Sequence, residues 1–76
     1  MMFEHLQHKR ISEEIIEAIV DQINSGSLTV GQKLPSERVL ANEMAVSRTS
    51  LREALRTMER MGYIRCTAGD GNISIR

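Results

Sequence analysis

The chain has 76 residues, which is enough for one small domain, and only two of them are aromatic. Its core must therefore be aliphatic, with little room for an enclosed catalytic cavity. The net charge is zero, but four basic and seven acidic residues precede Arg48, whereas six basic and three acidic residues lie from Arg48 onward. Net neutrality thus hides a basic region and does not exclude a polyanionic partner.

The amino-terminal ten residues, MMFEHLQHKR, lack the apolar segment of a secretory signal. No apolar run approaches the roughly 18 residues that a membrane-spanning helix needs. Cys66 is the only cysteine, so an intrachain disulfide is impossible and a reducing compartment is favoured. We therefore expect a cytoplasmic protein, or a part of one.

Residues 1–10 are polar and without a clear period, which predicts a flexible arm before a single domain over 11–76. A first helix is expected to start near Ile11, with Ser12 as its N-cap, and to stop at Gly26. Its apolar face repeats at helical spacing. That face consists of Ile11, Ile15, Ile16, Ile19, Val20 and Ile23.

Two further helices follow the connector that contains Pro35. Ser36 can cap the first of them, which runs to about Met44. Ser47 can cap the next one, which runs to about Met61 before Gly62. The residues expected to be buried are Val39, Leu40 and Met44 in the shorter helix and Leu51, Ala54, Leu55, Met58 and Met61 in the longer one.

The opposite side of the longer helix carries an arginine at every fourth position. The members of this row are Arg48, Arg52, Arg56 and Arg60. Glu53 and Glu59 can each pair with Arg56, but the first turn of the helix contains no acid. Arginines in the first turn oppose the helix dipole, which favours acidic residues there. Because this arrangement does not stabilise the helix, it indicates a functional role. A solvated arginine face is the alternative interpretation.

The residues of the first turn suit DNA. Arginine can donate two hydrogen bonds to guanine or to phosphate. The hydroxyls of Ser47, Thr49 and Ser50 can donate to phosphate oxygens near a helix start. In a helix-turn-helix unit, the second helix presents its first turns to base edges.

The last residues, YIRCTAGDGNISIR, change to strand-like alternation around a glycine-containing turn. They predict a two-stranded hairpin. The predicted fold is α+β and mainly helical, a winged helix-turn-helix of three helices followed by this hairpin.

The string KLPSERVLANEMAVSRTSLREALRTMERMGYI resembles the signature of the GntR family of bacterial transcription regulators, and the wording SLREAL is similar to its FadR-like branch. The resemblance spans about Ile11 to Ile75. It implies sequence-specific binding of a pseudo-palindromic duplex operator by a homodimer, with a recognition helix over about 47–61 in the major groove. A wing over 67–72 would lie at the minor groove. The resemblance also implies a separate effector domain, with a carboxylic acid as the expected class of effector, so the isolated domain is expected to be a monomer or weak dimer.

By the same resemblance, several residues are expected to bind DNA. Arg38 would contact the backbone or an adjacent base, the first turn of the recognition helix would lie in or beside the major groove, and Gly69 with Ala68 would meet the minor groove. The expected DNA-binding set is Arg38, Ser47, Arg48, Thr49, Ser50, Arg52, Ala68 and Gly69. Arg56 and Arg60 match no strong family contact and are interpreted as surface or phosphate-steering charges. Ala45 replaces the glycine that the family usually has in the turn, and Asp70 places a negative charge in the wing.

No catalytic residue set, cofactor motif or metal site is predicted. His5 and His8 share a helical face only if the arm is helical, and we interpret them as unliganded. The chain is therefore expected not to be an enzyme. The alternative function is a winged-helix protein-interaction module whose basic face binds an acidic partner.

Overall fold

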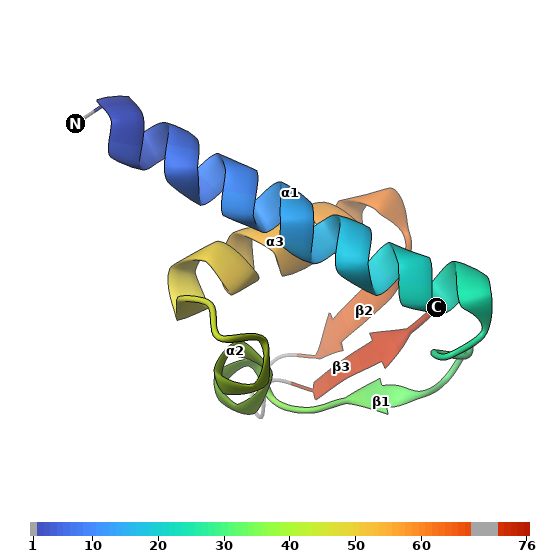
Figure 1. The fold of residues 1–76 in the computed structure, drawn as a ribbon. Coiled ribbons are helices and arrows are strands. Elements are labelled where there is room, and N and C mark those ends of the chain that lie inside the picture. The colour runs from blue at the N-terminus through green and yellow to red at the C-terminus, as the bar shows by residue number, and fades with distance from the viewer. Residues whose placement is uncertain (1, 68–71) are drawn as a thin grey trace.

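The computed structural model describes the backbone of residues 2–67 and 72–76, and the side chains of residues 10–67 and 73–76. The elements in order are α1 (Met2–Ser25), β1 (Lys33–Leu34), α2 (Glu37–Met44), α3 (Arg48–Met61), β2 (Ile64–Thr67) and β3 (Asn72–Ile75). Helix α1 crosses α3, and α2 and the small sheet lie below these two helices in the view of Figure 1. The arrangement confirms the predicted α+β winged helix-turn-helix fold.

Helix α1 is longer than predicted. It begins at Met2, so the expected helix start near Ile11 is wrong, and residues 2–10 have helical backbone rather than that of an irregular arm. This stretch contains neither proline nor glycine and is composed mainly of good helix formers. Ser12 is not an N-cap but lies inside the helix, where it is buried. The apolar face is confirmed, as is the end of the helix before Gly26, whose φ is 86°.

Hydroxyl groups cap the next two helices as predicted. Ser36 Oγ accepts a hydrogen bond from the Val39 amide at 3.4 Å, and Ser47 Oγ accepts one from the Ser50 amide at 3.1 Å. Between the two helices, Ala45 has φ 57° and ψ 43°, and its N–H points to the last carbonyls of α2. The turn therefore keeps a left-handed residue without the glycine that would adopt it at little cost.

The core forms where α1, α3 and the sheet meet. The residues of α3 that are buried there are Leu51, Ala54, Leu55 and Met58, as predicted. Met61 was expected in the same stripe but is 57% exposed, because the packed face ends one turn before Gly62 closes the helix. Val39 is also exposed rather than buried, since α2 packs through Leu40 and the adjacent Ala41 instead.

The sheet has one strand more than predicted, with the antiparallel order β1-β3-β2. The predicted hairpin strands pair with Cys66 opposite Ile73 and with Ile64 opposite Ile75. The additional strand β1 pairs with the other edge of β3, with Leu34 opposite Ile73. It is only two residues long, and Pro35 ends it because proline has no N–H to donate. The turn of the wing over residues 68–71 lies outside the described residues.

Candidate nucleic-acid interface

The first turn of α3 presents three exposed polar side chains. Thr49 is exposed, and the side chains of Arg48 and Arg52 have 59% and 50% of their surface accessible. The cap at Ser47 fixes where the helix begins, and the buried stripe of α3 fixes which face turns outward. The structure therefore brings Ser47, Arg48, Thr49 and Arg52 to one exposed end of this helix.

Glu37 at the start of α2 binds both arginines of this turn. Arg52 donates from Nη2 to Glu37 Oε1 at 2.9 Å and from Nε to the two carboxylate oxygens at 3.3 and 3.4 Å. Arg48 Nη2 lies 3.5 Å from Glu37 Oε1. The first turn of α3 contains no acid of its own, as predicted, but the interpretation that its arginines are therefore uncompensated is wrong. The acidic partner, Glu37, belongs to another helix and precedes Arg52 by 15 residues, so the sequence of α3 alone does not reveal it.

These contacts fix the charge state of the cluster. The hydrogen bond from Arg52 is the main reason that the pKa of Glu37 lies below its ordinary value of 4.5, and partial burial opposes this shift. The charges of Arg52 and Arg48 lower it further. The same hydrogen bond raises the pKa of the Arg52 guanidinium. At neutral pH the cluster is one carboxylate between two guanidinium groups, with a net positive charge.

The remaining predicted residues occupy different positions. Arg38 is exposed on α2, directly after Glu37. Ser50 is not on the exposed face: it is 1% exposed, and its hydroxyl lies 3.0 Å from that of Ser47. Ser50 therefore supports the capping residue rather than joining the exposed cluster. Ala68 and Gly69 lie outside the described residues.

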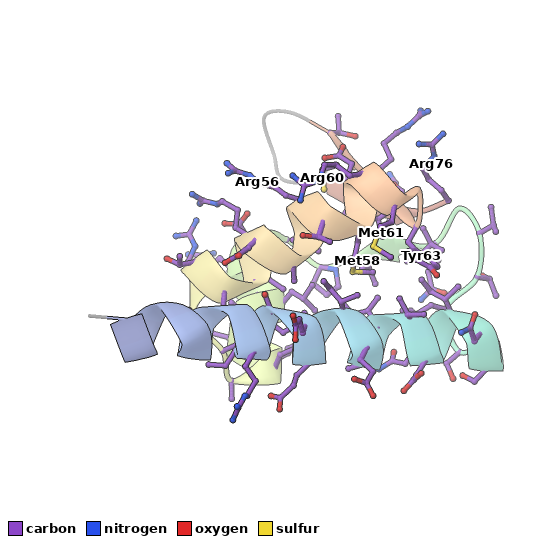
Figure 2. All side chains as sticks on the ribbon, turned by 90° about the horizontal axis from the view of Figure 1, so that it is seen from above. Arg56, Met58, Arg60, Met61, Tyr63 and Arg76 are labelled. Atoms are coloured by element: carbon purple, nitrogen blue, oxygen red, sulfur yellow. The ribbon has the colours of Figure 1, made fainter. Side chains whose placement is uncertain are left out.

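The second half of α3 carries the other two arginines. Arg56 and Arg60 lie on the side of the helix that faces away from α1, whereas Met58 lies between the two helices (Figure 2). They border an open hollow of about 470 Å³ that continues to the first turn. Its lining residues are Thr49, Arg52, Glu53, Arg56 and Arg60.

The predicted acidic partners of Arg56 do not pair with it. Glu59 Oε2 instead accepts a hydrogen bond from the backbone N–H of Cys66 at 3.2 Å, which links α3 to β2. Across the described side chains, neither Glu53 nor Glu59 lies within ion-pair distance of Arg56. The expected pairs Glu53–Arg56 and Glu59–Arg56 are therefore wrong. Because strand β2 starts three residues after α3 ends, it places a backbone donor beside Glu59 that helical spacing alone does not predict.

The structure offers little for other chemistry. Burial raises the pKa of the Cys66 thiol, and the nearby charges of Glu59 and Glu37 raise it further, so this cysteine is a poor nucleophile. No group of three or more potential metal ligands occurs among the side chains that the structure describes. The side chains of His5 and His8 lie outside that set. None of the helices in the described part of the chain combines the length and apolar character that crossing a membrane requires.

A helix-turn-helix with a flanking antiparallel sheet and an exposed arginine-rich second helix defines a winged-helix DNA-binding domain. Comparison with known proteins identifies the family of this domain. The model of the bacterial regulatory proteins of the gntR family matches residues 11–72. The chain belongs to this family, and it comprises the DNA-binding domain of a GntR-family transcription regulator.

Individual relatives agree with this assignment. An uncharacterized HTH-type transcriptional regulator of Mycobacterium tuberculosis is 38% identical over 72 residues, which is 95% of this chain and 30% of the relative. A GntR family transcriptional regulator from Listeria monocytogenes has a TM-score of 0.78 and 29% identity over 86% of this chain and 57% of its own. The AraR DNA-binding domain in complex with operator ORR3 has a TM-score of 0.75 and 28% identity, covering 84% of this chain and 77% of that one.

The chain spans less than a third of the length of the curated relative from Mycobacterium tuberculosis. The relatives are transcriptional regulators rather than enzymes, in agreement with the prediction that this domain is not an enzyme.

Proposed function

We propose that this domain reads a specific operator in double-stranded DNA, with α3 in the major groove and the wing over 67–72 at the minor groove. The observation that carries the proposal is the pair of exposed arginines at the start of α3, held by Glu37. Support also comes from the similar fold of the AraR DNA-binding domain, which has been solved with an operator.

Arg52 is the proposed base-reading residue. A guanidinium group has five N–H donors, and Glu37 engages the Nε–Nη2 edge of this one. The Nη1–Nη2 edge can then donate two parallel hydrogen bonds, which match O6 and N7 of guanine in the major groove. Glu37 would act as a positioning residue that orients this fork before DNA arrives. Arg48 would contact an adjacent base or phosphate.

The other contacts proposed here position the domain on the duplex. The Thr49 hydroxyl would donate to a phosphate oxygen at the start of α3, and the Ser47 hydroxyl, which donates to Ser50 Oγ in the free domain, would turn from Ser50 to a phosphate oxygen. Arg38 would reach the backbone or a neighbouring base from α2. Ala68 and Gly69 would meet the minor groove, where a glycine lets the backbone approach closely.

The intact regulator would work as a homodimer on a pseudo-palindromic operator in the bacterial cytoplasm. A small effector, with a carboxylic acid as the expected class, would bind a separate domain and control DNA binding. By itself, the 76-residue chain would be a monomer or a weak dimer. Its affinity for one half-site would therefore be lower than that of the intact dimer.

The proposal is tested by selecting bound duplexes from a random-sequence pool with the 76-residue chain. The affinity for the enriched duplex is then compared with that for a scrambled duplex of the same composition, by fluorescence anisotropy at several salt concentrations. We expect tighter binding of the enriched duplex and a steep loss of affinity with salt, because bound phosphates release counterions. Equal affinity for both duplexes would rule out sequence-specific reading. Absence of duplex binding at low salt, with a stable complex with an acidic protein, would instead favour a protein-interaction module.

A further inference from the structure

We propose that Arg56 and Arg60 form a phosphate-binding track that continues the DNA contact of Arg52 along the full length of α3. This inference rests on the proposed function, and it adds a site to the expected set of DNA-binding residues. It assigns a definite ligand, the phosphates along one edge of the groove, to arginines that the sequence alone presents only as surface or phosphate-steering charges.

The first support is the shape of the surface. Arg52, Arg56 and Arg60 border one open hollow instead of three separate patches. The hollow lies on the face of α3 that turns away from α1, and Figure 2 shows both Arg56 and Arg60 on that side. A ligand that meets Arg52 therefore has an uninterrupted surface leading to the other two side chains.

The second support is the charge of this surface. Among the described residues, three arginines and one glutamate line the hollow, and together they contribute a net charge of about +2 at neutral pH. Within the described part of the chain, no carboxylate lies within ion-pair distance of Arg56 or Arg60. Arg60 Nη2 donates a hydrogen bond to the Thr57 hydroxyl, at 3.4 Å. Like charges four residues apart repel one another, and phosphate anions would relieve this repulsion.

The third support is the match between helix and groove. At 1.5 Å per residue, Arg56 lies about 6 Å and Arg60 about 12 Å along the axis from Arg52. The major groove of B-DNA is about 8.5 Å deep, so a helix that enters it end-on with Arg52 at the base edges carries Arg56 up along the groove wall and Arg60 to its rim. Phosphates line that wall. The spacing thus places one arginine at the floor of the groove and two along its phosphate-lined wall.

The test uses the 76-residue chain with the enriched duplex from the selection and its scrambled counterpart. Arg56→Gln and Arg60→Gln should each reduce the slope of log affinity against log salt by about 0.9, and the double variant by about 1.8. At about 0.1 M salt, each single variant should bind either duplex roughly eightfold more weakly. Because phosphates carry no sequence information, the ratio of the two affinities should not change.

Three controls make the outcome decisive. Arg10→Gln removes the same charge from an exposed position about 140° around α1 from the buried Ile15, and it should leave the slope unchanged. Arg56→Lys keeps the charge and should retain most of the wild-type slope. Glu53→Gln removes the one negative charge that the described part of the chain places in the lining of the hollow, and it should tighten binding to both duplexes.

The inference is overturned if the wild-type chain binds duplex but the two glutamine variants keep its salt slope. A fall in the ratio between enriched and scrambled duplex would also overturn it, since Arg56 or Arg60 would then read bases. If the wild-type chain binds neither duplex, the proposed function itself fails and this inference fails with it.

Discussion

The two halves of α3 carry the same residue at the same spacing in different surroundings. In the first half, Arg48 and Arg52 are tied to a carboxylate from another helix. In the second half, Arg56 and Arg60 face an open hollow, and Glu59 is engaged by the backbone of β2. A guanidinium group held by a carboxylate has a defined direction, which suits reading a base, whereas one without a carboxylate partner suits a phosphate that can be approached from many directions.

This contrast shows that helical spacing identifies the exposed face but not the role of each member. The role depends on neighbours that arrive from elsewhere in the fold. Substitutions in each half can therefore test whether the difference is real.

The first prediction concerns stability: truncation of an apolar side chain should be costly in the buried part of α3 but not in its last turn. Met58→Ala should lower the free energy of unfolding by about 2–5 kcal/mol, because this side chain has no exposed surface and its removal leaves a cavity. Met61→Ala, in the next turn, should change it by less than about 0.5 kcal/mol. Urea unfolding followed by circular dichroism measures both. Equal losses would show that the packed face continues to the end of the helix.

Within the arginine row, Arg52→Ala should have the largest effect on DNA recognition. We expect the affinity for the enriched duplex to fall roughly 5- to 150-fold and the preference over the scrambled duplex to decline, because a two-bond contact with a base is lost. Anisotropy titrations on both duplexes measure this ratio. Arg56→Ala is the matched control from the second half and should weaken both affinities alike. If both variants lost preference equally, the contrast between the halves would be false.

Glu37→Gln should leave the arginines in the first half of α3 without a carboxylate partner, as they are in the second half. We expect the preference for the enriched duplex to fall by less than in Arg52→Ala, because Arg52 remains but its direction is less defined. Affinity for the scrambled duplex should rise, since one negative charge is removed near the duplex. The same titrations measure both quantities, and an unchanged preference would show that Arg52 does not need its partner.

The effect of Glu37→Gln on stability should depend on pH. The folded-state pKa of Glu37 is lowered, so the stabilisation from its ion pairs is complete above its ordinary value of 4.5 and is lost as the pH falls through the lowered value. The urea midpoint of Glu37→Gln should therefore lie below that of the wild type at about pH 7, and the difference should shrink by about pH 3. A difference that stayed constant with pH would exclude the carboxylate as its source.

The smallest effect concerns the turn that leads into the first half. Ala45→Gly should raise the free energy of unfolding by about 0.5–1 kcal/mol, because relief of the left-handed strain outweighs the extra freedom of glycine in the unfolded chain. Ala18→Gly, at an exposed right-handed position of α1, should instead lower it by about 1 kcal/mol. Chemical unfolding measures both. Loss of stability in both variants would show that Ala45 is not strained.

Features fixed by neighbouring residues were predictable from the sequence. The caps at Ser36 and Ser47 and the stop at Gly62 depend on hydrogen bonds within a few residues, and the structure confirms all three. The apolar stripes of α1 and α3 follow from helical periodicity, except for Met61, which continues the period but is exposed. The start of α1 was missed because residues 2–10 have helical propensity but no apolar period to reveal it.

Features that depend on distant residues were not predictable in the same way. The carboxylate of Glu37 reaches Arg52 only because the turn at Ala45 folds α2 back against α3. Strand β1 exists because β3, almost 40 residues later, offers it an edge. Two residues are too few to show the alternation by which a strand is recognised in a sequence.

The position of β3 has a consequence for how the domain is made. It is the last strand in the chain but the central one in the sheet, and it supplies the buried Ile73 and Ile75 to the core. On the ribosome, the helices can form as they emerge, but β1 and β2 have no partner until residues 72–75 leave the exit tunnel. Until that segment emerges, the nascent domain exposes two unpaired strand edges, and both of them wait for the same strand β3.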